Sequence, residues 1–188
     1  MFRFASGISL TKTSLATLSK QEFGEEEPRF FIKACLEVWG ESERKVYVAD
    51  SFQGLPKPNA DQFPEDQGDL HYSYSFLSVT EEDVRENFKK YGLLDDRIIF
   101  LKGWFKDTLP KAPMNSIALL RADGDMYEST LDILDNLYPK LSPGGYCIID
   151  DYALTGCRKA VHDYREKYEI TEEIMAIDSI SAYWKKES

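Results

Sequence analysis

Residues 119–125 have the sequence Leu-Leu-Arg-Ala-Asp-Gly-Asp, an apolar run that ends in two carboxylates. Residues 146–151, Tyr-Cys-Ile-Ile-Asp-Asp, repeat the pattern. Each run has the length of a buried strand. In an open parallel sheet, the carboxyl ends of the strands point at the ligand crevice. The two segments therefore predict strands that bring four carboxylates to one site.

Strands and helices alternate along the chain on both sides of these segments. Apolar runs predict strands over 46–50, 97–101, 117–122 and 146–149. Helical spacing or capping predicts helices over 30–39, 80–91, 127–141 and 157–168. Residues 142–145 form a strong turn signal, and 173–177 with 181–184 predict a closing strand pair joined at Asp178. The alternation predicts an α/β fold with a mostly parallel sheet and an antiparallel C-terminal edge strand.

The bulk composition limits the class of protein. The 188 residues suit one domain, divided here into a divergent segment 1–29 and a main part 30–188. A net charge of −10 argues against a nucleic acid partner. We expect no transmembrane segment and no signal peptide. The three cysteines lack metal-ligand spacing, which favours reduced thiols in a cytoplasmic protein.

Four carboxylates at one site would repel one another unless a cation lies among them. Oxygen ligands select Mg²⁺ or Ca²⁺, with Mn²⁺ as a further candidate, and no histidine cluster supports zinc. The alternative is that these acids cap turns and helices, since Asp125 precedes a predicted helix and Asp151 a loop. Two such pairs on successive strand ends favour the metal.

Other residues allow two interpretations each. Asp50 ends an early strand, where an acid either accepts hydrogen bonds from ribose hydroxyls or caps the following turn. Trp104 and Phe105 form either an aromatic wall for a planar ring or part of the core. His162 shares a helix face with Arg158, and a structural contact is the favoured interpretation there. The long loop 51–75 has a length that is typical of functional loops. His71 lies in it, but its sequence context is only a weak signal for contact with a ligand.

Together these segments resemble the macrocin O-methyltransferase family. The resemblance covers roughly residues 30–184 and is carried by ordered blocks at 48–56, 91–96, 103–110, 121–130, 138–145, 150–152 and 157–164. It implies a Rossmann-like class I methyltransferase fold. It also implies an enzyme that depends on S-adenosylmethionine and Mg²⁺ and methylates a sugar hydroxyl of a small glycoside or other natural product.

The resemblance also implies roles for single residues. Asp125 would be the general base that takes the proton from the sugar hydroxyl. The metal ligands would be Asp123, Asp150 and Asp151. The methyl donor would be held by Asp50, Ser51, Phe52, Gly103, Trp104 and Phe105.

The N-terminal region departs from the family pattern, which has an acidic residue and a glycine-rich turn after the first strand. Residues 20–28 have the sequence Lys-Gln-Glu-Phe-Gly-Glu-Glu-Glu-Pro instead. The first strand, expected between the strands that end at Asp50 and Asp123, is therefore missing or replaced. Residues 2–5 are a weak substitute, and 13–22 favour a helix.

Three explanations stay open for this departure: an incomplete enzyme, a divergent way of binding the donor, or a non-catalytic homologue that keeps the metal and sugar site. An incomplete sheet would also favour a homo-oligomer.

Overall fold

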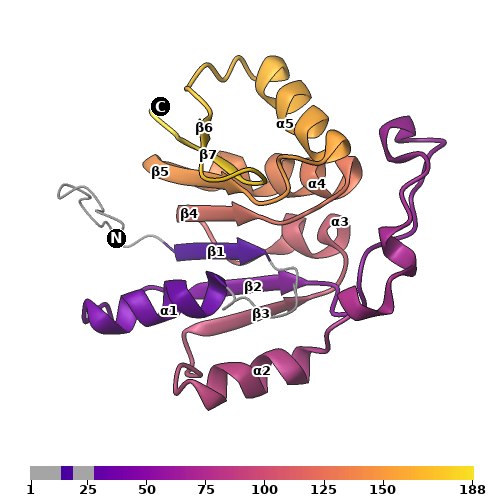
Figure 1. Cartoon of the computed structure of the whole chain (residues 1–188). Coiled ribbons are helices and arrows are strands. Elements are labelled where there is room, and N and C mark those ends of the chain that lie inside the picture. Colours follow the sequence, from indigo (N-terminus) through magenta and orange to yellow (C-terminus); the bar gives the residue numbers. More distant parts are fainter. Residues whose placement is uncertain (1–13, 19–27) are drawn as a thin grey trace.

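The structure, a computed structural model, describes residues 14–18 and 28–188 (Figure 1). The strands are β1 Ser14–Leu18, β2 Val46–Asp50, β3 Ile98–Lys102, β4 Ile117–Ala122, β5 Leu141–Ile149, β6 Met175–Ala176 and β7 Ala182–Lys185. The α-helices are α1 Pro28–Val38, α2 Glu81–Lys90, α3 Phe105–Thr108, α4 Tyr127–Leu137 and α5 Thr155–Lys167. Short 3-10 turns are η1 Pro64–Asp66, η2 His71–Ser73, η3 Ser75–Leu77, η4 Leu109–Lys111 and η5 Tyr138–Lys140.

The described strands form one sheet in the order β3-β2-β1-β4-β5-β7-β6. The pairs β3–β2, β2–β1, β1–β4 and β4–β5 are parallel, and β5–β7 and β7–β6 are antiparallel. The predicted α/β fold with a mostly parallel sheet and an antiparallel C-terminal edge is confirmed. Parallel β4 and β5 are neighbours, so their acidic carboxyl ends meet at the same edge of the sheet.

The central strand is present. β1 pairs with β2 on one side and with β4 on the other, which is the place expected for the first strand. The helix predicted over 13–22 is wrong for residues 14–18, because hydrogen bonding to two neighbouring strands outweighs weak helical spacing. The candidate at residues 2–5 and most of the altered segment 20–28 lie outside the described residues. With β1 in place, the described sheet has no gap at its centre.

The turn predicted at 142–145 lies within β5 instead. Ile117 of β4 pairs with Leu141, whereas Leu119 pairs with Tyr146, so β5 carries extra residues against β4. Pro143 cannot donate a ladder hydrogen bond, and Gly144 has φ +83°, which suits such a bulge. The turn chemistry therefore bends the strand without ending it.

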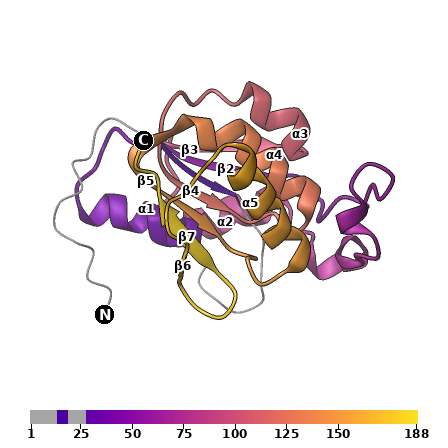
Figure 2. The same ribbon diagram turned by 90° about the horizontal axis from the view of Figure 1, so that it is seen from above.

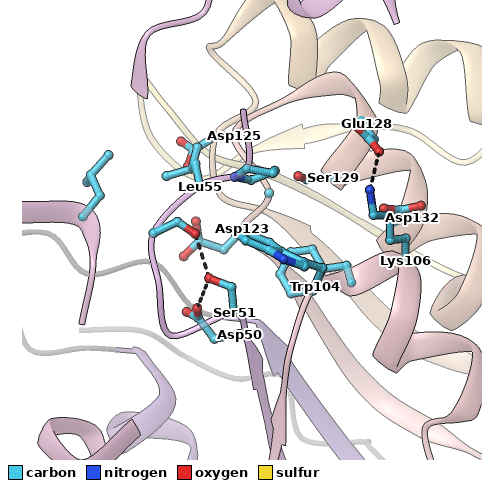
Figure 3. Close-up of a pocket in the computed structure, with 15 residues that line it drawn as sticks. Asp50, Ser51, Leu55, Trp104, Lys106, Asp123, Asp125, Glu128, Ser129 and Asp132 are labelled. Carbon is cyan, nitrogen blue, oxygen red and sulfur yellow. Dashed lines mark hydrogen bonds and ion pairs between the residues drawn. The ribbon is translucent and has the colours of Figure 1, made fainter. Parts of the chain in front are cut away.

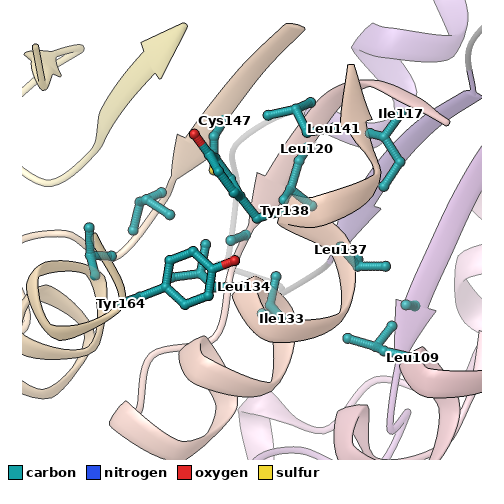
Figure 4. Close-up of a cluster of buried hydrophobic side chains, with 14 of the residues drawn as sticks. Leu109, Ile117, Leu120, Ile133, Leu134, Leu137, Tyr138, Leu141, Cys147 and Tyr164 are labelled. Atoms are coloured by element: carbon teal, nitrogen blue, oxygen red, sulfur yellow. The ribbon is translucent and has the colours of Figure 1, made fainter. Parts of the chain in front are cut away.

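Two buried clusters cover the two faces of the sheet. Val46 and Val48 of β2 join Leu36 of α1 and Phe88 of α2 on one face. Tyr47, which alternates with them along β2, belongs to the other cluster. That cluster includes Leu134 of α4 and Tyr164 of α5 (Figure 4). Successive side chains of β2 thus enter two different clusters. The run of residues 46–49 is apolar because helices cover both faces of the sheet there.

The segment between β2 and α2 projects from the end of the sheet at which the parallel strands finish (Figures 1 and 2). It contains η1, η2 and η3 and corresponds to the long loop predicted at 51–75. Thr80 caps α2 as predicted, and its side chain accepts a hydrogen bond from the N–H of Asp83. Among the described residues, none of the helices combines the length and the apolar composition that crossing a membrane requires.

Candidate functional site

Three carboxylates meet where β4 and β5 end, and we call them the acidic cluster: Asp123, Asp125 and Asp151. One oxygen of each lies within 4.8 Å of the others, and all three residues are buried. Asp125 has φ +52°, a left-handed conformation that non-glycine residues seldom adopt. The chain reverses there, and this brings Asp125 back beside Asp123. Such backbone conformations concentrate at functional sites.

Asp150 lies apart from the acidic cluster because adjacent residues point to opposite sides of a strand end. Its carboxylate forms an ion pair with Arg121 Nη2. The other terminal nitrogen of Arg121 lies 3.4 Å from Asp123 Oδ2. Arg121 is a buried residue of β4. The sequence pattern had not predicted a role for this cation. The structure thus groups the predicted base with two predicted metal ligands and places the third beside an arginine.

The electrostatics of the acidic cluster favour a bound cation. Burial raises the pKa of Asp123 well above its usual range; Arg121 opposes this, and the charges of Asp151, Asp150 and Asp125 add to it. A buried group of like charges is costly unless a counter-ion neutralises it. Several carboxylate oxygens converging at one point suit a hard ion such as Mg²⁺ and not zinc. The residues present therefore fit the predicted metal.

A pocket opens beside the acidic cluster (Figure 3). It is lined by Asp50, Ser51, Gly54, Leu55, Pro56, Leu77, Trp104, Phe105, Lys106, Asp123, Gly124, Asp125, Glu128, Ser129 and Asp132. Four of the six predicted donor-binding residues are among them: Asp50, Ser51, Trp104 and Phe105. The predicted base and one predicted metal ligand face the same space. Residues predicted to bind the donor therefore line the same pocket as the predicted base and one predicted metal ligand.

Asp50 shapes the turn that follows β2. Its Oδ1 accepts a hydrogen bond of 2.7 Å from the N–H of Phe52, and Ser51 Oγ donates to the carbonyl of Gly54 at 2.7 Å. The turn-capping interpretation is confirmed, and Asp50 also lines the pocket. Phe52 is buried in the core, with its ring centroid 6.1 Å from that of Phe100, and it is not among the lining residues.

Gly103 places Trp104. Its N–H donates to the carbonyl of Asp50 at 2.9 Å, which ties the end of β3 to the end of β2. Gly103 has φ +137°, and a Cβ there would lie 2.8 Å from Thr108 Cγ2 in α3. Only glycine fits this corner, after which Trp104 and Phe105 enter the pocket. Phe105 also packs against the core, as the core interpretation of this residue predicted.

The two histidines lie outside the pocket lining. His162 Nε2 is 2.9 Å from Tyr152 Oη, and Arg158 Nε donates to the carbonyl of Tyr152 at 3.0 Å. These contacts agree with the structural interpretation of His162 and Arg158. His71 Nδ1 lies 2.9 Å from Asp69 Oδ2 within the loop after β2.

Sequence reasoning missed several residues of the site. Glu128 and Asp132 of α4 line the pocket opposite Lys106, whose Nζ lies 3.7 Å from Glu128 Oε1. Burial raises the pKa of Asp132 to about 6, and the charge of Glu128 adds to this. Asp66, from the loop after β2, is buried against the start of α4. Nothing in the local sequence marks Asp66, because its partners lie about 60 residues away.

Comparisons with known proteins identify the family of the chain. Residues 28–186 match the family described as Macrocin-O-methyltransferase (TylF). A 4'-O-methyltransferase from Streptomyces olivaceus, which acts on 8-demethyl-8-(2,3-dimethoxy-alpha-L-rhamnosyl)-tetracenomycin-C, is 53% identical over 156 residues, 82% of this chain and 60% of that protein. Mycinamicin III 3''-O-methyltransferase from Micromonospora griseorubida is 48% identical over 159 residues, 83% of this chain and 63% of that protein. The chain thus spans about three fifths of the length of these curated relatives.

A solved structure shares the fold. The O-methyltransferase NovP superposes with a TM-score of 0.85 and 43% identity, covering 94% of this chain and 72% of NovP. This likeness confirms the predicted Rossmann-like class I methyltransferase fold.

Proposed function

Because the chain belongs to the macrocin O-methyltransferase family, we propose that it transfers a methyl group from S-adenosylmethionine to a sugar hydroxyl of a small glycoside or other natural product, with Mg²⁺ as cofactor. The two curated relatives are named for methylating glycosylated natural products, which supports this class of acceptor. Their names differ in the position methylated, so the identity of the hydroxyl is not part of the proposal.

One observation carries the proposal: residues predicted to bind the donor and acidic residues line a single pocket. Asp50 and Ser51 come from the end of β2 and Trp104 from the end of β3, where a nucleoside is bound in open α/β sheets. Asp123 and Asp125 come from the end of β4. A donor bound against the first three residues would therefore present its methyl group near the two carboxylates.

In the proposed reaction, some residues of the chain would bind the metal and another would accept the proton. Asp123, Asp150 and Asp151 would hold the metal, with Asp150 exchanging its contact with Arg121 for the ion. When bound, Mg²⁺ lowers the pKa of a hydroxyl, and S-adenosylmethionine supplies a methyl group on a sulfonium. Asp125 would accept the proton of the acceptor hydroxyl. Asp125 would keep this proton while the acceptor oxygen bonds to the methyl carbon, and the electron pair of the broken carbon–sulfur bond would remain on the sulfur of the donor.

Asp50 and Trp104 act by positioning. Oxygen, methyl carbon and sulfur must be aligned for the displacement, and fixed orientation of reacting groups lowers the barrier. The hydrogen bond between Gly103 and Asp50 holds the two donor-binding strand ends together, so their side chains would keep one geometry while the donor binds.

Calorimetric titration with S-adenosylmethionine, with and without Mg²⁺, tests the proposal. We expect binding by the wild type and a loss of at least tenfold in affinity in Asp50→Ala. Asp96→Ala is the matched control, because Asp96 is an exposed carboxylate near the opposite end of β3. Absence of donor binding in both conditions would overturn the proposal in favour of a non-catalytic homologue.

A further inference from the structure

We propose that Asp66 is a positioning residue, which ties the loop after β2 to the acidic cluster and holds Asp125 in place. The inference rests on the proposed function, because it assigns Asp66 a part in the same reaction. Asp66 does not line the pocket and would not contact the substrate.

Asp66 caps α4 from a distance in sequence. Its Oδ1 accepts the N–H of Tyr127 at 2.7 Å and its Oδ2 the N–H of Glu128 at 3.0 Å. The first N–H groups of a helix have no partner within it, and a carboxylate is well suited to them. Met126, the residue at the cap position, provides no side-chain hydrogen bond. The loop thus supplies the cap that the local sequence of α4 lacks.

This cap lies directly behind the proposed base. Tyr127 begins α4 two residues after Asp125, and the N–H of Met126 between them bonds back to the carbonyl of Gly124. Asp125 has φ +52°, which the surrounding structure must stabilise. Two hydrogen bonds that fix the next amides limit the movement of the Asp125 backbone. Asp66 therefore acts on the carboxylate of Asp125 through the intervening backbone and not by direct contact.

The same carboxylate lies close to α5, the helix that follows Asp150 and Asp151. A Cβ at Gly156, in the first turn of α5, would lie 3.2 Å from Asp66 Oδ1 and 3.3 Å from the nitrogen of Tyr127. Asp66 is only 3% exposed. It thus lies where the starts of α4 and α5 come together, just beyond Asp125 and Asp151.

Neighbouring residues hold the loop in this place. Lys159 of α5 forms an ion pair of 3.6 Å with Glu65, and the rings of Phe63 and Tyr127 have centroids 6.1 Å apart. The stem of the loop contributes Leu55, Pro56 and Leu77 to the pocket. The order of the loop and the placement of the carboxylates are therefore coupled, and Asp66 contributes the two hydrogen bonds to the backbone at the start of α4.

Steady-state kinetics of Asp66→Ala and Asp66→Asn test the inference, with Asp61→Asn, an exposed acid of the same loop, as control. We expect kcat to fall at least about tenfold in Asp66→Ala, since small misplacements of reacting groups are costly. Donor affinity should stay within about twofold, because local hydrogen bonds hold the turn of Asp50 and Ser51, and Trp104 follows β3. Asp66→Asn should lose less, since its one carbonyl oxygen still accepts an N–H.

Gly156→Ala is a second variant that leaves the carboxylate in place. The added methyl group would press on Asp66, while alanine favours the helix. We expect kcat to fall without a loss of thermal stability, a result that a merely structural role would not give. A kcat in Asp66→Ala and Gly156→Ala equal to that of the control, at equal folded fraction, would overturn the inference.

Metal binding separates this inference from the proposed function. If the wild type proves unable to transfer a methyl group, Mn²⁺ titration still reports on the acidic cluster. We expect Asp66→Ala to bind Mn²⁺ at least about threefold more weakly than Asp61→Asn, with faster amide exchange at Tyr127 and Glu128. Equal Mn²⁺ affinity and equal exchange would overturn the role of Asp66, whatever reaction the protein performs.

Discussion

Charged side chains gather at both ends of the sheet, and the two groups differ in what neutralises them. At the carboxyl ends of β4 and β5 lies the acidic cluster, in which Asp123 forms an ion pair with Arg121. Near the amino ends of β2 and β3 lies a second group, which we call the compensated cluster: Lys33, Glu37, Glu41, Arg44, Asp95 and Arg97. It contains three acids and three bases.

The pKa values move in opposite directions in the two clusters. Burial raises the pKa of Asp95, but hydrogen bonds from Arg97 and Lys33 outweigh it and lower the pKa to about 2. Burial and like charges raise the pKa of Asp123. Among the described residues, cations of the chain lower the pKa of an acid in one cluster, whereas burial and like charges raise it in the other. This difference separates a structural network from a functional site more clearly than the number of acids does.

The largest expected effect comes from removing the proposed base from the acidic cluster. Asp125→Asn keeps the size of the side chain but cannot accept the proton, so we expect kcat to fall about 10³-fold. The measurement is turnover on a glycoside that the wild type methylates, with donor affinity checked by calorimetry. Asp96→Asn is the control. A kcat within about threefold of the wild type would remove Asp125 from the base role.

Breaking the compensated cluster should cost stability and not activity. Lys33 is 1% exposed, and its Nζ lies 2.8 Å from Asp95 Oδ2 and also contacts Glu37. Lys33→Met removes the cation from two acids. Because the acids are partly solvated and Arg97 remains, we expect a loss of about 1–2 kcal/mol, less than for a fully buried pair.

Urea unfolding measures this change, with Lys90→Met, at the exposed end of α2, as the matched control. A free energy of unfolding equal to that of the control would show that the compensated cluster contributes nothing to stability.

The sequence predicted those features of the molecule that depend on local pattern. Asp123 and Asp150 could be placed because each follows an apolar run that ends at the ligand edge. β1 could not, since Ser-Leu-Ala-Thr-Leu is not a continuous apolar run, and its strand conformation comes from its two neighbours. Asp66 was missed for a related reason: its partners are distant in sequence. The same holds for Lys33 and Asp95, which are 62 positions apart.

Neutralising an acid within the acidic cluster should raise the free energy of unfolding, whereas Lys33→Met should lower it. The raised pKa of Asp123 means that its ionised form destabilises the metal-free fold. In EDTA, Asp123→Asn should therefore raise the free energy of unfolding by about 1 kcal/mol, or the melting temperature by about 2–4 °C. Added Mg²⁺ should stabilise the wild type and not the variant. A lower melting temperature in EDTA would show that the cluster is already compensated without an ion.

The smallest expected effect is a change in acid sensitivity at the compensated cluster. The pKa of Asp95 is lowered from 3.8 to about 2, so its ionised form stabilises the fold. That contribution is fully present above about pH 4 and is lost as the pH falls toward 2. Its side chain is 34% exposed, and solvent screening reduces the contribution to about 1 kcal/mol.

Asp95→Asn should therefore be less stable than the wild type by that amount at pH 6, and the difference should vanish near pH 2. Urea unfolding at both pH values measures it, with Asp96→Asn as the neighbouring control. A difference that persists at pH 2 would assign the effect to lost hydrogen bonds and not to charge. The effect of Asp95 on the free energy of unfolding would then come from its hydrogen bonds. The charge of Asp95 would no longer distinguish the compensated cluster from the acidic cluster.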